Sequence, residues 1–192
     1  MKNPTENPIH ELLESRWSPY GFDKSKPVQS TDLASLFEAA RWTMSAYNEQ
    51  PWRYIVANQQ TDKDLWEKVL STLVEGNRPW AKHVPVLALG LVQSNFTKNG
   101  KPNPTAIHDL GAASAFLTVE ATARGLSVHQ MSGILPDLVK STFSLPDTLQ
   151  PVTALAIGYA GPNSELEDSY AQRDSGKRQR MPLNEILLQS SL

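Results

Sequence analysis

The spacing of apolar residues along the chain alternates between helical and strand patterns, and it predicts most of the elements. Between residues 30 and 42 apolar side chains recur every three or four positions, which places on one side of a helix Leu33, Leu36, Phe37 and Ala40. The apolar run 54–57 that follows is short enough for a buried strand. Residues 84–92 are apolar on both faces, as in a central strand, with Pro85 tolerable only near its start.

The same reading extends to the rest of the chain. Further helices are predicted after the N-caps Asn7 and Thr61, ending near Arg16 and at residues 76–77, and over residues 105–124 and 136–143. Further strands are predicted at residues 127–131 and 152–158, whereas residues 161–176 are polar. Small residues at 111–115 favour a tightly packed central helix that could also meet a second subunit. Because helices lie between strands without regular βαβ alternation, the fold class is α+β.

The connection between the first long helix and the next strand, residues 45–53, is rich in amides and aromatic rings. Pro51 disfavours helical backbone at Gln50, so Asn48 and Gln50 should lie on a turning or extended backbone with their amides outward. Joining a helix to the next strand needs only a few residues, so the nine residues 45–53 are more than the connection itself requires. Two interpretations stay open, namely a surface shaped for a planar ligand with polar edges, and an ordinary polar loop.

Cationic residues gather near both ends of the chain. Arg16 follows a short helix and stands beside Ser18, and a guanidinium next to a hydroxyl suits a phosphate. Local sequence alone favours the simpler alternative that Arg16 binds the C-terminal carbonyls of its own helix. The cluster at Lys177, Arg178 and Arg180 reads, by itself, as a solvated tail.

Length and composition narrow the classes of protein. The 192 residues fit one domain, residues 1–192, and the formal charge of −2 gives no global attraction to nucleic acid or anionic lipid. Cysteine is absent, which excludes disulfides and thiolate chemistry. No stretch approaches the roughly 18 apolar residues of a membrane span, and residues 1–10 lack a signal-peptide core. We therefore expect a cytoplasmic protein with neither a membrane nor a nucleic-acid partner.

The common catalytic signatures are missing. His10, His83, His108 and His129 show no metal-ligand spacing, so no metal site is expected. The sequence contains no Gly-x-Ser-x-Gly elbow, no Gly-x-Gly-x-x-Gly and no phosphate-binding Gly-Lys-Ser/Thr loop. With no evident nucleophile we assign no catalytic residue. The pattern suits a bound cofactor that carries the chemistry itself.

Four segments resemble, in order, the FMN-dependent nitroreductase family. They are residues 16–18, 40–53, 125–133 and 178–183, so the resemblance extends over nearly the whole chain. It implies the α+β sandwich of that family, FMN as cofactor and NAD(P)H as electron donor. It also implies a homodimer with two FMN sites at the subunit interface, with the C-terminal segment, about 177–192, packing on the partner.

The resemblance further implies three groups of FMN-binding residues. The phosphate-end group would hold the phosphate and ribityl end, and it consists of Arg16, Trp17, Ser18, Arg178 and Arg180. The turn group would bond the ribityl chain and the ring and border the substrate space, and it consists of Ser45, Tyr47, Asn48 and Gln50. The strand-end group would face the central edge of the ring, and it consists of Gln130, Met131, Ser132 and Gly133. Asn77 and Arg78 are weaker candidates.

The chain departs from the family at two places. Where members usually have Pro-Ser-Ser this chain has Met44-Ser45-Ala46, so one hydroxyl contact is lost. Many members carry a lysine at the position of Tyr20, directed at the pyrimidine edge of the flavin, which becomes negative on reduction. With Tyr20 in that place, another group must stabilise the charge.

The implied reaction is a ping-pong transfer of hydride from NAD(P)H through flavin N5 to an electron-poor acceptor such as a nitroaromatic or a quinone. One alternative is a flavin-dependent reductase or dehydrogenase that acts on a conjugated carbonyl or another small metabolite. A second alternative is a non-enzymatic binding module that uses the basic C-terminal cluster. The near-neutral total charge counts against that module.

Overall fold

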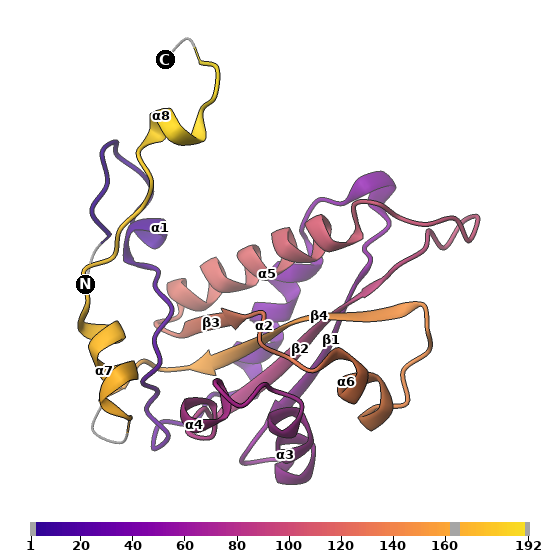
Figure 1. Cartoon of the computed structure of the whole chain (residues 1–192), viewed down its shortest axis with the longest axis horizontal. Coiled ribbons are helices and arrows are strands. Elements are labelled where there is room, and N and C mark those ends of the chain that lie inside the picture. Colours follow the sequence, from indigo (N-terminus) through magenta and orange to yellow (C-terminus); the bar gives the residue numbers. More distant parts are fainter. Residues whose placement is uncertain (1–2, 162–165, 191–192) are drawn as a thin grey trace.

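The centre of the protein is a four-stranded antiparallel sheet, seen in a computed structural model that describes residues 3–161 and 166–190 (Figure 1). Its strands are β1 (Trp52–Asn58), β2 (Val86–Gln93), β3 (Ser127–Met131) and β4 (Leu149–Gly158). They lie in the order β1-β2-β4-β3, so β2 and β4 are internal and β3 is an edge strand. The sequence prediction of β2 as a central strand is correct, and its first seven residues are all buried.

Helices cover both faces of this sheet, as an α+β domain requires (Figure 1). On one face lie the two long helices, α2 (Ser30–Arg41) and α5 (Ala106–Ala123). On the other face lie the shorter α3 (Lys63–Ser71), α4 (Arg78–Ala81) and α6 (Pro136–Thr142). Three further helices belong to the chain ends, α1 (Glu11–Ser15), α7 (Asp168–Ser175) and α8 (Leu183–Ile186).

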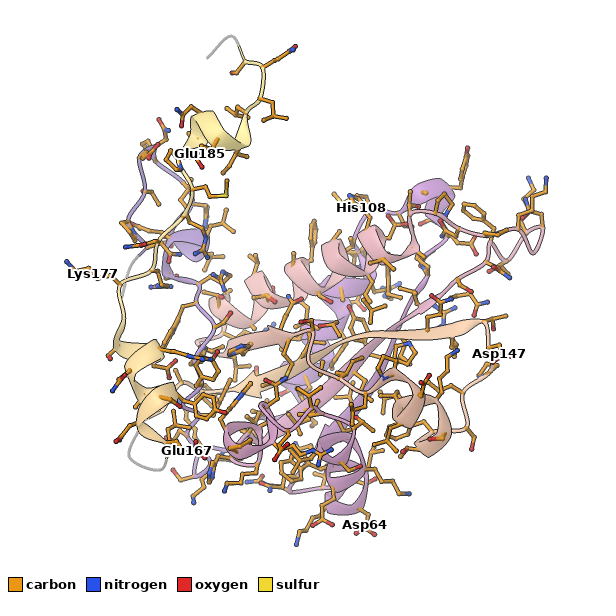
Figure 2. All side chains as sticks on the ribbon, in the orientation of Figure 1. Asp64, His108, Asp147, Glu167, Lys177 and Glu185 are labelled. Carbon is orange, nitrogen blue, oxygen red and sulfur yellow. The ribbon has the colours of Figure 1, made fainter. Side chains whose placement is uncertain are left out.

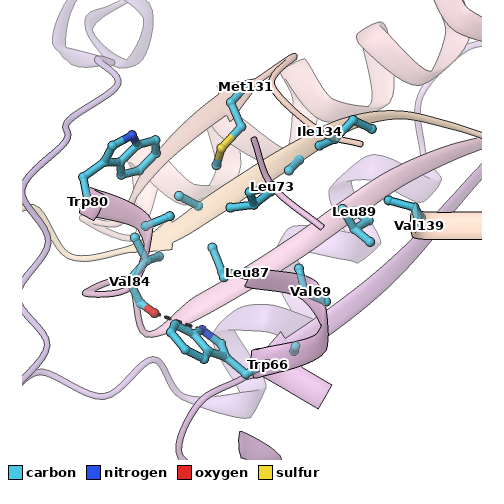
Figure 3. Close-up of a cluster of buried hydrophobic side chains, with 14 of the residues drawn as sticks. Trp66, Val69, Leu73, Trp80, Val84, Leu87, Leu89, Met131, Ile134 and Val139 are labelled. Carbon is cyan, nitrogen blue, oxygen red and sulfur yellow. Dashed lines mark hydrogen bonds between the residues drawn. The ribbon is translucent and has the colours of Figure 1, made fainter. Parts of the chain in front are cut away.

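Side chains along β2 point alternately to the two faces of the sheet, and this divides the core into two clusters. Leu87, Leu89 and Leu91 face α3 and α4, where Trp66 and Trp80 are also buried (Figure 3). Their neighbours along the strand pack against α2 and α5. This period of two explains why the strand is apolar throughout, since each of its faces lies in a separate hydrophobic cluster.

Gly90 of β2 relieves crowding inside the sheet, because a Cβ there would lie 2.9 Å from Cγ2 of Thr153 on the neighbouring strand β4. Cδ1 of Leu110 on α5 would lie 3.5 Å from that Cβ, which is ordinary van der Waals contact. The outward side of α5 carries small and apolar residues together with the exposed His108. Ile107, 59% exposed, and Phe116, 42% exposed, lie at the two margins of this side, because nine residues place them half a turn apart.

Three predicted boundaries were wrong. The first helix begins at Glu11, where Nδ1 of His10 accepts a hydrogen bond from the Leu12 amide at 3.2 Å, so Asn7 is not its cap. Asp62, one residue after Thr61, caps α3 through the Leu65 amide at 2.9 Å. That helix ends at Ser71, and the separate helix α4 begins at Arg78.

The polar stretch 161–176 contains a helix that the apolar pattern did not predict. Residues 162–165 lie outside the described residues, and α7 follows them. Beyond α7 the chain extends away from the body and carries α8, none of whose residues is buried (Figure 1). Residues 191–192, at the end of the segment expected to pack on a partner, also lie outside the described residues. No described helix combines the length and apolar character needed to cross a membrane.

Candidate functional site

The phosphate-end group is assembled from the two ends of the chain. Arg16 is the residue directly after α1, and its Nη1 donates to Oγ of Ser18 at 3.3 Å. Nη1 of Arg178, 162 positions later, donates to the backbone oxygen of Arg16 at 2.9 Å. The guanidinium of Arg178 also lies 5.9 Å from the centre of the Trp17 ring, in range of a cation–π contact. The structure therefore brings these four residues together.

Positive charge accumulates at this place. Burial lowers the pKa of the Arg16 guanidinium from its ordinary value, and repulsion from Arg180 and Arg178 lowers that pKa further. Burial and Arg180 lower the pKa of Arg178 in the same direction. The three side chains line a hollow of about 300 Å³ beside α1. Because a bound phosphate would offset their repulsion and accept their N–H groups, the group fits the phosphate of a nucleotide. Lys177, the neighbouring cation, points away from the body (Figure 2).

The strand-end group lies where β3 leaves the sheet. The backbone oxygen of Gly133 accepts hydrogen bonds from Nδ2 of Asn77 at 3.0 Å and from the Val74 amide at 3.1 Å. A Cβ on Gly133 would lie 2.4 Å from that Asn77 nitrogen, so only glycine permits this approach. Ser132, next to it, is exposed. The amide of Asn77 and the backbone at 132–133 thus form one polar corner.

Two members of the strand-end group have side chains that are already engaged within the chain, although Gln130 is exposed. Nε2 of Gln130 donates to the backbone oxygen of Ser114 at 3.1 Å and to Oγ1 of Thr118 at 3.0 Å, both on α5. Met131 is only 7% exposed and packs in the cluster that Figure 3 shows. Their contribution to a ligand would come from the backbone, which is accessible because β3 is an edge strand.

Tyr20 connects the two groups through an aromatic cluster. Its ring packs edge-on against Trp80 at 5.1 Å and against His129 at 4.7 Å between ring centres. Nδ1 of His129 donates to the backbone oxygen of Pro19 at 2.8 Å, since a carbonyl can only accept. Burial lowers the pKa of His129, so its ring is neutral at pH 7. Nε1 of Trp80 is buried with no hydrogen-bond partner within the described ranges.

The helix α7 is fastened to the backbone beside Tyr20. The carboxylate of Asp174, 9% exposed, accepts from the Tyr20 amide at 2.8 and 3.0 Å and from the Gly21 amide at 2.9 Å. The hydroxyl of Tyr170 donates to the backbone oxygen of Gly76 at 2.8 Å. Thus α7 is bonded both to Gly76, the residue before Asn77, and to the segment that contains Tyr20.

The turn group forms a strained loop around the short 3₁₀ helix η1 (Ala46–Asn48). Tyr47, Asn48 and Gln50 have φ of 55°, 56° and 52°, a left-handed region that non-glycine residues rarely adopt. Oγ of Ser45 accepts from the Gln50 amide at 3.0 Å, so this hydroxyl serves the turn itself. Strain of this kind persists only where the surroundings impose it, and it concentrates at functional sites.

A buried carboxylate holds this loop on α5. Oδ2 of Asp109, 3% exposed in the first turn of α5, accepts from the Ala46 amide at 3.2 Å. The loop therefore leaves the Tyr47 ring outside, where it is 93% exposed and meets the Phe96 ring edge-on, with 6.0 Å between ring centres. His108, the neighbour of Asp109, stands on the outer side of α5 (Figure 2).

Within one chain the turn group and the phosphate-end group are far apart. The turn group lies at the N-terminal end of α5, through Asp109, whereas α1 lies beside the C-terminal end of that helix (Figure 1). An 18-residue α-helix is about 27 Å long. The segments that resembled one site in the sequence thus lie at two separate places in a single chain.

Several residues that build these two places were absent from the sequence prediction. Among the described residues, the two buried carboxylates are Asp109 and Asp174, and each bonds a backbone amide more than sixty positions away. Asp109 had a visible signal, since a carboxylate on an otherwise apolar helix side needs a buried partner. Asp174 had none, because its surrounding sequence is polar throughout.

Comparisons with known proteins identify the family of the chain. The family model described as Nitroreductase family matches residues 13–159. The major NAD(P)H-flavin oxidoreductase of Aliivibrio fischeri is 28% identical over 210 residues, covering 85% of this chain and 92% of the relative. A 15.4 kDa protein of Mycolicibacterium smegmatis is 31% identical over 140 residues, covering 70% of this chain and 92% of the relative.

A solved structure described as an oxidoreductase containing FMN has a TM-score of 0.89 and 32% identity, and the match covers 96% of this chain and 92% of that one. The fold is therefore that of known relatives. The chain belongs to the nitroreductase family.

Proposed function

We infer that this protein is an NAD(P)H-dependent flavin oxidoreductase that binds FMN. The observation that carries the inference is the convergence of Arg16, Ser18, Arg178 and Arg180 from both chain ends, in a chain of the nitroreductase family. The three guanidiniums neutralise the phosphate, and the hydroxyl of Ser18 adds a polar contact. Asn77 and the backbone at 132–133 then meet the polar edge of the ring.

The working site is a dimer site. A second chain whose α5 packs antiparallel on the outer face of this α5 brings its turn group beside this chain's phosphate-end group. Support comes from the apolar outer face of α5, whose exposed members include Ile107, Gly111, Ala115 and Phe116. Such a face is typical of a subunit interface. The extended C-terminal segment, with Met181 60% exposed and Ile186 57% exposed, packs on the same partner.

The chain's residues position reactants and supply no nucleophile. When bound, FMN accepts hydride from NAD(P)H and passes it to an acceptor. The exposed Tyr47 of the partner subunit would border the space over the bound ring, where donor and acceptor would bind in turn. This sequential use of one space gives ping-pong kinetics, with an electron-poor acceptor such as a nitroaromatic or a quinone. A conjugated carbonyl is the second acceptor class, and following NAD(P)H loss with a panel of acceptors separates the two.

A comparison of Arg178→Ala with Lys177→Ala tests the cofactor site. The two residues are adjacent cations, but only Arg178 lines the hollow beside α1. We expect the purified protein to be yellow, with Arg178→Ala losing FMN about ten- to a hundredfold more easily, because it removes a charge-assisted phosphate contact. Lys177→Ala should retain FMN as the wild type does.

Two results would contradict the proposal. A colourless wild-type protein that takes up no added FMN removes the flavin function. Equal losses of nucleic-acid affinity in both variants, with FMN retention unchanged, favour the binding-module alternative instead.

A further inference from the structure

The position of Tyr20 raises the question of which cation stabilises the flavin when it becomes negative. This question rests on the proposed function. In the proposed binding mode the cations of the phosphate-end group hold the opposite end of the cofactor. The ring edge would then lie near Asn77, whose Nδ2 bonds Gly133, and near Tyr20, which α7 joins to the segment before Asn77.

Two other basic groups at this edge are unsuited to the task. Arg78 donates from Nε to the Leu73 oxygen and from Nη2 to the Ser71 oxygen, both at 2.8 Å, so its charge is directed at the end of α3. His129 packs on Tyr20, but its buried ring is neutral. A neutral imidazole adds no positive charge to the edge of a flavin.

Arg173 of α7 is the cation that does lie at Tyr20. Its Nη1 donates to the Tyr20 hydroxyl oxygen at 3.2 Å. Its guanidinium carbon lies 5.7 Å from the centre of the Tyr20 ring and 5.8 Å from that of Tyr170. The side chain is exposed, so its N–H groups beyond the Tyr20 bond face solvent and could reach a ligand.

The backbone under Arg173 is fixed by its neighbours. Asp174, the next residue, is buried and holds three hydrogen bonds to the amides of Tyr20 and Gly21. Tyr170, three residues earlier, bonds the Gly76 oxygen at 2.8 Å. These contacts hold α7 across the segments that carry Tyr20 and Asn77, and Arg173 stands between the two attachment points.

We propose that Arg173 stabilises the reduced flavin in this protein by placing its positive charge at the pyrimidine edge, with Tyr20 as its support. The task that many family members give to a lysine at position 20 is thus divided between two residues. Tyr20 fills the space and orients the cation, and Arg173 supplies the charge from another helix. Arg173 is a positioning and electrostatic residue that forms no bond to the substrate.

The test measures the reduction potential of bound FMN in Arg173→Gln, Arg173→Lys and the wild type, by visible spectra in equilibrium with a redox dye. Loss of the charge should weaken binding of reduced FMN about tenfold relative to oxidised FMN, which lowers the potential by about 30 mV for a two-electron couple. Arg173→Lys should keep most of the wild-type potential. Lys68→Gln, which removes an exposed cation from α3, is the matched control and should match the wild type.

The possible outcomes separate this proposal from the proposed function. A wild-type protein that binds no FMN overturns both. A flavin-loaded Arg173→Gln with wild-type potential overturns this proposal alone. If the reduction potential of FMN falls as far in Arg173→Lys as in Arg173→Gln, the positive charge is not the cause. The role of Arg173 is then only to hold α7 against Tyr20.

Discussion

The phosphate-end group and the turn group differ in how the chain builds them. Long-range bonds between residues near positions 16 and 178 assemble the first, which concentrates positive charge. The second is a local turn with three left-handed residues, held on α5 by Asp109. The two unlike groups thus lie at opposite ends of one helix, and in the proposed dimer a two-fold partner would complete both sites at once.

The largest effect should come from separating the two groups. Gly111→Glu places a charge on the outer face of α5, where a Cβ meets no atom within 4 Å in the single chain. The fold should persist, but two facing carboxylates in the dimer cost several kcal/mol, so dimer and FMN are lost together. Size-exclusion chromatography and the visible spectrum measure this. Lys68→Glu on α3 is the control for the change in charge and should leave dimer and FMN in place. A monomeric Gly111→Glu protein that still holds FMN would show that the two groups do not form one site across a dimer.

A smaller effect is expected where α7 is fastened. Asp174→Ala leaves the amides of Tyr20 and Gly21 without their acceptor, which should lower the free energy of unfolding by about 2–3 kcal/mol. Urea denaturation measures the change. Asp168→Ala removes an exposed carboxylate from the same helix and should cost far less. Equal losses in the two variants would show that the buried carboxylate has no special role.

His129 should make the phosphate-end side sensitive to pH. Burial lowers its pKa in the folded state below the ordinary 6.5, so the unfolded chain takes up the proton first. Stability should therefore fall as the pH drops below about 6.5, until the folded pKa is reached. Unfolding curves from pH 8 to pH 5 should be flatter for His129→Gln than for the wild type. Parallel curves would mean that other groups cause the dependence.

The smallest effect concerns strain in the turn group. Gln50→Gly accepts φ of 52° without a Cβ penalty, so the free energy of unfolding should change by no more than about 1 kcal/mol, toward greater stability. If the strained backbone serves the ligand, FMN affinity falls nevertheless. Gln59→Gly, outside the turn group and without positive φ, is the control and should be destabilising. A gain in both stability and FMN affinity would show that the strain has no function.

Local patterns predicted the elements that bury apolar residues with regular spacing. The predicted strand 84–92 is β2, and the predicted helix 105–124 is α5, because both are long and uninterrupted. The nitroreductase family and the α+β class are confirmed. The helix α7 was missed because it is stabilised by Asp174 and not by an apolar stripe. The residue assignments of the three groups remain predictions.

The sequence by itself determined the α+β class, the central strand and the family, since these depend on periodicity and on the order of short segments. It also indicated that Arg16 and Arg178 belong together. Only the tertiary structure decided that the turn group lies at the other end of α5, and that Arg173 meets Tyr20. The physical reason is that periodicity reports which face of an element is buried, whereas the meeting of distant polar groups depends on how whole elements pack.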